Sequence, residues 1–235
     1  MQSVELRSMH VTVIIPALNE EDQVSGTVLS AQQAGADQIV VVDGGSHDDT
    51  VAVAQSAGAN VIRATAPGRS LQQNLGAREA VGDVLLFLHA DCLLQADAVS
   101  MLRQHLTDHP AVVGGCFHQM IDDDAWKFRL LEFGNACRVH LLKWIFGDQG
   151  LFVRRCVFEE LGGFPEDRFP EDLFFSKQLK QRGSVSVLGS RITVSARRWN
   201  RRGVLQQTLR NWSIITAAHL GVSAGALLRF YPNDR

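Results

Sequence analysis

The 235-residue sequence lacks the features that mark a membrane-spanning or secreted protein. No stretch approaches the roughly 20 consecutive apolar residues that cross a bilayer. The first ten residues contain no basic segment followed by a long apolar core, so they do not resemble a secretory signal. We therefore expect a cytoplasmic protein with no transmembrane segment.

The sequence also lacks a surplus of charge and any clustering of cysteine. Its formal net charge is −2 at pH 7, which argues against nucleic acid as an electrostatic partner. The four cysteines are far apart and form no CxxC pair, so neither a zinc site nor a disulfide framework is predicted. Repeats and low-complexity segments are missing as well. A chain of this length fits one domain spanning residues 1–235.

The first half alternates apolar, β-branched runs with segments of helical spacing. The runs predict strands and the other segments predict helices, in the order 11–16, 24–34, 39–42, 50–57, 61–62, 71–80, 84–88 and 97–107. Alternation with short connections predicts an α/β fold with a mostly parallel sheet covered on both faces.

After Pro110 the pattern becomes mixed. We expect strands or extended chain at 112–120, 151–153 and 185–196, helices at 122–143 and 171–182, and a turn at 147–150. From Arg197 the chain reads as helical and basic. The domain thus divides into a ligand-binding half at about 10–110, an acceptor and catalytic half at about 111–200, and a C-terminal helical segment at about 201–235.

Two carboxylates directly follow apolar strands. Asp43 ends the run 40–42, and Asp91 follows the run 84–88. In open α/β sheets, ligands bind where strands end at their carboxyl side. Asp43 is placed to accept hydrogen bonds from a base N–H or a ribose hydroxyl, although a turn former before Gly44 is the alternative. Asp91 is placed to bind a hard divalent cation or, alternatively, to cap the following segment.

Five blocks of the sequence resemble, in order, those of the family 2 glycosyltransferases. The blocks are 13–20, 41–46, 74–77, 86–91 and 170–172. The segments 89–91, 147–150 and 195–199 resemble a subgroup of small bacterial transferases that includes arsenosugar-biosynthesis glycosyltransferases. The resemblance implies a GT-A fold with a Rossmann-like sheet, and inverting transfer of a sugar from a nucleotide-diphosphate sugar to a hydroxyl acceptor. UDP-sugar is the expected donor, with Mn²⁺ or Mg²⁺ as cofactor.

The resemblance assigns donor-site roles to residues in the first blocks. Asp43 becomes a partner of the nucleotide base, and Pro16 and Asn19 shape the loop that binds the nucleotide. Glu20 either contacts the ribose or stabilises a helix start. Arg69 meets the donor at the start of a helix, or is a solvated loop arginine.

His89 and Asn74 complete the donor side. Asn74 belongs to the third family block and is carried over as a substrate-binding residue. His89 stands where the family more often has the first carboxylate of an Asp-x-Asp motif. Its imidazole either bonds the ribose or diphosphate, or is satisfied by a backbone carbonyl. Because Mn²⁺ tolerates a nitrogen ligand better than Mg²⁺, the metal at Asp91 is expected to be Mn²⁺ at least as readily as Mg²⁺.

Asp172 is the predicted catalytic base. Inverting transfer needs one base to take the proton of the attacking hydroxyl, while metal or arginine stabilises the departing diphosphate. Asp172 follows Glu171 at a helix start, where acids are also favoured for purely structural reasons. The family pattern selects Asp172 as the base and leaves Glu171 as a substrate-binding neighbour.

Further substrate-binding residues are expected from two polar segments. Asp148 and Gln149 lie in a glycine-bounded turn that either holds acceptor hydroxyls or is a plain β-turn. Arg197, Arg198 and Trp199 follow a strand and either clamp the diphosphate and stack on a sugar, or form a solvated face.

Two alternative functions and the role of one segment stay open at this level. A sugar nucleotidyltransferase would normally have a glycine-rich phosphate loop near its N-terminus, and residues 16–22 lack glycine. An inactive nucleotide-sugar-binding regulator is the second alternative. The basic, apolar segment 197–212 fits peripheral contact with the inner face of the membrane, packing on the core, or a homo-oligomer.

Overall fold

The computed structural model describes residues 9–66 and 68–230. Its strands are β1 (Val11–Ala17), β2 (Gln38–Asp43), β3 (Asn60–Arg63), β4 (Val84–Phe87), β5 (Cys92–Leu94), β6 (Val112–Ile121), β7 (Leu151–Arg154) and β8 (Ser184–Val194). Its α-helices are α1 (Val24–Gln33), α2 (Thr50–Ser56), α3 (Arg69–Glu79), α4 (Ala98–Asp108), α5 (Trp126–Leu142), α6 (Arg155–Glu160), α7 (Glu171–Arg182), α8 (Arg197–Arg202), α9 (Val204–His219) and α10 (Ala224–Phe230). A 3₁₀ helix, η1, spans Gly147–Gln149.

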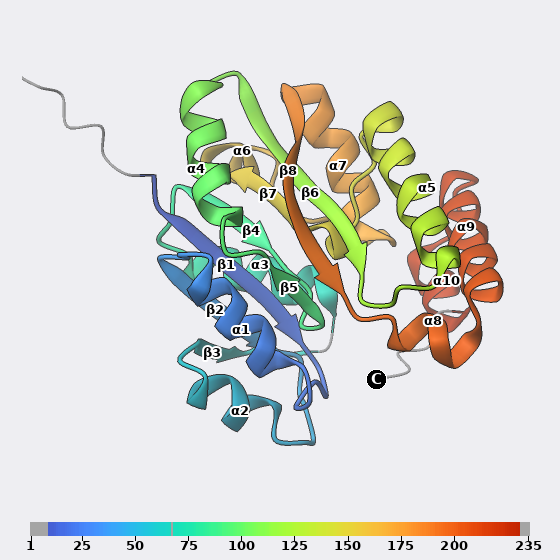
Figure 1. Ribbon diagram of the computed structural model, residues 1–235, viewed down its shortest axis with the longest axis horizontal. Helices are drawn as coiled ribbons and strands as arrows, with labels where there is room; N and C mark the ends of the chain where they lie inside the picture. The colour runs from blue at the N-terminus through green and yellow to red at the C-terminus, as the bar shows by residue number, and fades with distance from the viewer. Residues whose placement is uncertain (1–8, 67, 231–235) are drawn as a thin grey trace, which may run out of the picture.

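All eight strands form one sheet in the order β3-β2-β1-β4-β7-β6-β8-β5. The first four strands of this order are parallel, whereas β7 is antiparallel to both β4 and β6, and β5 is antiparallel to β8. Helices flank the sheet, and α5, α8, α9 and α10 gather at the end of the molecule away from β3 and α2 (Figure 1). The predicted α/β architecture is confirmed, with one mixed sheet that is parallel from β3 to β4 and carries antiparallel pairs beyond β4.

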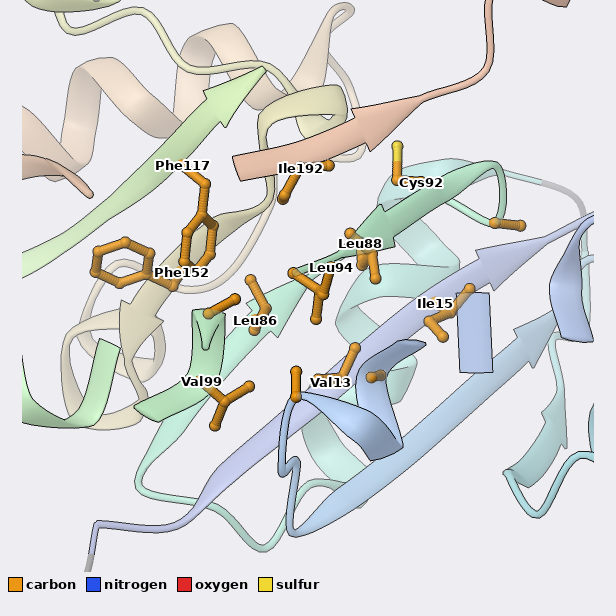
Figure 2. Close-up of a cluster of buried hydrophobic side chains, with 14 of the residues drawn as sticks. Val13, Ile15, Leu86, Leu88, Cys92, Leu94, Val99, Phe117, Phe152 and Ile192 are labelled. Atoms are coloured by element: carbon orange, nitrogen blue, oxygen red, sulfur yellow. The ribbon is translucent and has the colours of Figure 1, made fainter. Parts of the chain in front are cut away.

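The core lies on both faces of the sheet. Val13 and Ile15 point to one face with Leu86, and Ile14 points to the other with Phe87, because side chains alternate along a strand. Figure 2 shows the first of these clusters, in which β1, β4 and β5 pack against Phe117, Phe152 and Ile192 of the second half. This shared core joins the two halves, as expected for strands that are apolar on both faces.

The C-terminal helices follow β8 directly. Among the residues that the structure describes, no helix combines the length and the apolar composition needed to cross a membrane.

The helix expected to start at 122 begins instead at Trp126, after an extended connection from β6.

Gly76 sets how closely α3 packs on the sheet. A Cβ at this position would lie 2.4 Å from Ile14 Cγ2 and 3.0 Å from Val42 Cγ2. We expect Gly76→Ala to lower the free energy of unfolding by roughly 1–3 kcal/mol, because the helix must move off the core. Urea denaturation measures the change. Gly134→Ala, in the middle of α5 where a Cβ meets nothing within 4 Å, should instead stabilise the protein by about 0.5–1 kcal/mol. Equal effects of the two substitutions would contradict this account.

Candidate active site

Asp43 lies at the carboxyl end of β2, where the sequence predicts it. The residue is only 2 % exposed, and its Oδ1 accepts a hydrogen bond from the Ser46 amide at 3.0 Å. Its Oδ2 lies 4.0 Å from Nε of Arg63, an exposed residue that the sequence analysis did not single out. The carboxylate is thus fixed by the following turn and stands beside a cation at the edge of the parallel half.

The loop after β1 is tied to the loop after β2. Asn19 adopts a left-handed backbone conformation with φ of 52°. Its amide donates to Ser46 Oγ at 2.9 Å, and its Oδ1 accepts from the His47 amide at 3.0 Å. Pro16 pairs with Val42 beyond the last residue of β1 that pairs with β4, so its missing N–H interrupts no ladder on that side. The two loops therefore form one rigid rim around Asp43.

Gln72 supports this rim from below and was missed by the sequence analysis. Its side chain is buried on α3, where Nε2 donates to the carbonyls of Ala17 at 2.9 Å and Val42 at 2.7 Å. The amide thereby holds the ends of β1 and β2 together. One feature of the sequence could have identified Gln72 as buried. It lies four residues before Gly76, and residues four apart share one face of a helix.

The His89–Asp91 turn crosses from β4 to β5, and its three carbonyls are all bonded. The His89 carbonyl accepts from the Cys92 amide at 3.1 Å, the Ala90 carbonyl from Thr27 Oγ1 at 2.7 Å, and the Asp91 carbonyl from the Ser195 amide at 3.3 Å. The turn is fixed by both halves of the chain, because Thr27 lies on α1 and Ser195 follows β8.

The side chains of this turn could hold a metal ion. Ligand atoms of His89, Asp91 and Cys92 lie within 4.8 Å of one another, and all three residues are buried. A carboxylate and an imidazole fit Mn²⁺ well, and Mg²⁺ through the carboxylate. Cys92 is buried as a member of the apolar cluster of Figure 2, and its Sγ donates to Asp91 Oδ1 at 3.8 Å. Asp91 and His89 are therefore the fitting ligands, and Cys92 supports Asp91.

Arg197 joins this turn to the loop after β1. Its guanidinium forms an ion pair with Glu20 and also lies 3.9 Å from Asp91 Oδ2. Glu20 is buried, with its amide donating to Thr50 Oγ1 at 2.8 Å. The sequence analysis expected Glu20 to contact the ribose or to stabilise a helix start. It did not predict the ion pair with Arg197. The predicted Arg198 side chain lies outside the described residues.

Asp172 lies at the N-terminus of α7, nearly buried at 3 % exposure. Its Oδ2 accepts a hydrogen bond from the Gly147 amide at 2.9 Å, and Oδ1 has no hydrogen-bond partner among the described residues. A Cβ on Gly147 would lie 2.2 Å from His89 Nε2 and 3.0 Å from Asp172 Oδ2. A side chain at 147 would therefore displace His89 or Asp172, and the glycine lets Asp172 and the His89–Asp91 turn, called the metal turn below, lie close together.

The environment of Asp172 suits a proton acceptor. Burial, followed by repulsion from Glu171, raises the pKa of Asp172 to about 7, while Arg69 and the Gly147 amide counteract the rise. Arg69 Nη1 lies 3.4 Å from Glu171 Oε1. Arg69 at the start of α3 is thus directed to the carboxylate pair Glu171 and Asp172 at the start of α7, about a hundred residues later in the sequence.

A cavity of about 150 Å³ is bordered by Asp172 and by the metal turn, whereas Glu171 is not among its lining residues. It is lined by six of the predicted residues, namely Arg69, His89, Asp91, Asp148, Asp172 and Trp199. Helices α5 and α9 provide its other wall, through residues such as Asn135, Arg138, Gln207 and Trp212. The structure therefore brings together residues from both predicted halves and from the C-terminal segment.

Two predicted residues serve neighbours instead of the cavity. Gln149 is buried, and its Oε1 accepts from Arg138 Nη2 at 3.2 Å and from the Phe146 amide at 3.4 Å. Asn74 uses both amide hydrogens on the Phe164 carbonyl and Glu166, and its Oδ1 accepts from the Phe164 amide. It lines a different cavity, beside the loop that precedes α7. Substrate contact by either residue stays a prediction. The observed contacts of Gln149 and Asn74 hold neighbouring protein segments in position.

The wall formed by α5 and α9 holds polar residues that the sequence analysis missed. Arg138 is buried with its guanidinium carbon 4.2 Å from the Phe146 ring centroid, and burial lowers its pKa to about 10, so it stays charged. Asp148 Oδ2 accepts from Gln119 Nε2 at 2.7 Å, and Gln119 Oε1 accepts from Asn135 at 2.6 Å. Asp148 was predicted from its turn, but no sequence signal marked Arg138, Gln119 or Asn135, because each lies within an otherwise ordinary helix or strand.

The fold is of the expected GT-A type, with a carboxylate at the end of β2 and a second carboxylate at the turn where the two halves meet. The chain belongs to Glycosyl transferase family 2, whose family model matches residues 12–162. The predicted family and fold are confirmed.

Three known proteins are similar to the chain over much of its length. The O-antigen chain rhamnosyltransferase RfbN of Salmonella typhimurium is 29 % identical over 198 residues, covering 74 % of this chain and 62 % of its own. The chain thus spans less than two thirds of that relative's length. The structure of the mannosyltransferase PcManGT from Pyrobaculum calidifontis with GDP-Man and Mn²⁺ has a TM-score of 0.69 at 22 % identity, covering 92 % of this chain and 63 % of that one. Glucosyl-3-phosphoglycerate synthase of Mycobacterium tuberculosis, solved with Mn²⁺ and UDP, has a TM-score of 0.58 at 18 % identity, covering 80 % and 70 % of the two chains.

Proposed function

We propose that this protein is an inverting glycosyltransferase that moves a sugar from a nucleotide-diphosphate sugar to a hydroxyl acceptor. The observation that carries the proposal is Asp172: a nearly buried carboxylate with one oxygen fixed by Gly147 and the other lacking a partner among the described residues. It lines the same cavity as Asp91. A base and a metal-binding carboxylate are thus available to one substrate pair.

On the donor side, the rim around Asp43 binds the nucleotide. The Asp43 carboxylate accepts from the base, and the rigid loops 16–20 and 43–47 enclose base and ribose. A UDP-sugar is the proposed donor, and the diphosphate extends from this rim towards Asp91. When bound there, Mn²⁺ or Mg²⁺ neutralises charge that develops on the leaving diphosphate. His89 and Asp91 are the residues that would hold it, and Arg69 and Arg197 add positive charge nearby.

On the acceptor side, the cavity favours a compound with several hydroxyls. Trp199 Nε1 and Gln207 Oε1 are buried polar atoms for which the described residues provide no hydrogen-bond partner, and both residues line the cavity. An orphaned donor and an orphaned acceptor are each costly unless a ligand satisfies them. A hydroxyl both donates and accepts, so it matches both atoms. Asp172 Oδ1 then takes the proton of the hydroxyl that attacks.

The protein is proposed to act in the cytoplasm. Its cysteines form no disulfide among the described residues, which fits a reducing compartment.

The test is turnover of candidate donors. Purified protein with Mn²⁺ should release nucleoside diphosphate from one of a panel of UDP- and GDP-sugars, slowly with water and faster with the true acceptor. The anomeric configuration of the product, measured by NMR, should be opposite to that of the donor. Tight binding without release would favour the regulator, and formation of a nucleotide sugar from a sugar phosphate would favour a nucleotidyltransferase.

Asp43 gives a separate prediction for the donor rim. Asp43→Asn keeps an oxygen for the Ser46 amide but removes the charge that a base N–H would contact. UDP affinity should fall by roughly 10- to 100-fold, the size of one hydrogen bond to a charged group. Isothermal calorimetry measures it. Asp108→Asn, on the exposed end of α4, is the matched control and should leave UDP affinity as it was. Unchanged affinity in a folded Asp43→Asn protein would remove Asp43 from the site.

A further inference from the structure

Helix α5 carries an exposed apolar stripe. Trp126, Leu130, Phe133 and Leu141 recur at intervals of three, four or eight residues, so they lie on one side of the helix. Each is between 62 % and 77 % exposed. The stripe lies opposite the face through which Phe128 and Val139 are buried in the core. Nothing in the described part of the protein covers these side chains.

Helix α9 carries a second stripe of the same kind. Leu205, Leu209 and Trp212 recur every three or four residues and are 74 %, 60 % and 48 % exposed. They lie opposite the face that buries Ile214 and Ala218. The two helices are neighbours, because residues of both line the same cavity and they stand together at one end of the molecule (Figure 1). We call the two stripes together the α5–α9 face.

The chain that forms α8, α9 and α10 is strongly cationic. Residues 197–230 contain six arginines and no lysine, aspartate or glutamate, for a net charge of +6. Subtracting this charge from the −2 of the whole chain leaves −8 for the remaining residues. Exposed Arg201 and Arg229 lie at either end of the segment, and exposed Lys127 lies next to Trp126 on α5. Positive charge is thus concentrated on the segment that carries the α9 stripe, whereas α5 has Lys127 beside Trp126 but follows the acidic run Asp122–Asp124.

We propose that the α5–α9 face docks on an anionic lipid bilayer. Helix α9 combines apolar residues and tryptophan on one side with bordering arginines and no acidic residue, and this combination partitions into a negatively charged membrane interface. A second copy of the chain is disfavoured as the occupant, because a symmetric dimer would bring two cationic segments together. Docking places the cavity wall formed by α5 and α9 at the lipid surface and does not depend on the proposed chemistry.

Sedimentation with vesicles tests the docking, using the full chain and no substrate. The protein should bind vesicles that contain phosphatidylglycerol much more strongly than vesicles of phosphatidylcholine alone, and added salt should weaken the binding. Tryptophan fluorescence should shift to shorter wavelength on binding, and Trp126→Phe should reduce that shift. Each arginine lost from the segment, as in Arg201→Gln, should weaken binding by about fivefold.

Apolar variants separate the face from the rest of the surface. Leu205→Ser with Leu209→Ser, and Leu130→Ser with Phe133→Ser, should each weaken vesicle binding roughly tenfold or more. The matched control, Leu29→Ser with Val81→Ser, removes two exposed apolar side chains from other elements and should change binding less than about twofold. Thermal melts confirm that each variant is folded. The proposal is overturned if the protein binds neither vesicle type, or if the control pair weakens vesicle binding as much as the face variants do. It is also overturned if the face variants only turn a dimer into a monomer.

Discussion

Asp172→Asn should lower the rate of sugar transfer by roughly 10²–10⁴-fold, the usual contribution of a general base. Asparagine has the same size and still accepts from the Gly147 amide, which in the native protein bonds Asp172 Oδ2 at 2.9 Å. It cannot take a proton, so the attacking hydroxyl stays neutral. Donor affinity should barely change, because the loss falls on an interaction made in the transition state. Steady-state kinetics for turnover and calorimetry for donor binding separate the two effects.

Glu171→Gln is the control for this substitution and has its own pH signature. Glu171 is buried and lies 3.4 Å from Arg69, and its charge is the second cause that raises the pKa of Asp172. Turnover of the native protein should rise with pH through about 7, since the base is active only after losing its proton. In Glu171→Gln the midpoint should move to lower pH while activity survives. Loss of activity in Glu171→Gln with near-normal Asp172→Asn would show that the base is misassigned.

Asp91→Asn should cause the second large loss, on the order of 10²-fold or more in turnover. A bound divalent cation contributes several kcal/mol of charge stabilisation, and every 1.36 kcal/mol is about tenfold in rate. Mn²⁺ affinity, measured by calorimetry with UDP present, should fall in parallel. Mn²⁺ should serve the native protein at least as well as Mg²⁺, because His89 offers a nitrogen beside the carboxylate.

Asp124→Asn is the matched control for Asp91, since Asp124 is an exposed carboxylate before α5 and away from the cavity lining. It should leave turnover and Mn²⁺ affinity unchanged. Full activity of the native protein after exhaustive chelation would contradict a metal role for Asp91. Stabilisation of the diphosphate would then fall to Arg69 and Arg197.

The sequence predicted the parallel half well because its strands are long apolar runs with carboxylates at their ends. Asp43 and Asp91 lie where that rule places them. The short strand β5 was missed, since three residues carry no periodicity and its partner β8 comes near the end of the acceptor half. Helix α6 was missed for the same reason of length. These elements exist because of tertiary pairing more than local preference.

Side-chain partners were the least predictable part of the site. Family blocks identified Glu20 and Arg197, but nothing in either block indicates that the two form an ion pair. Asn74 was grouped with substrate residues, yet its amide holds the loop before α7. Gln72, Arg138 and Gln207 are polar residues buried by long-range packing, and their sequence neighbours do not distinguish them from solvent-exposed residues.

The position of β5 at the sheet edge has a consequence for the order of folding. Cys92 pairs with Val194, and the Asp91 carbonyl is bonded by Ser195, so the metal turn is completed by residues at the far end of β8. Contacts between segments so distant in sequence form late, because a long loop must close first. A chain still being synthesised can assemble β1 to β4, yet it lacks an ordered Asp91 until β8 has joined the sheet. The proposed cation site would therefore be a marker of complete folding, and Mn²⁺ with UDP should protect the native state against unfolding.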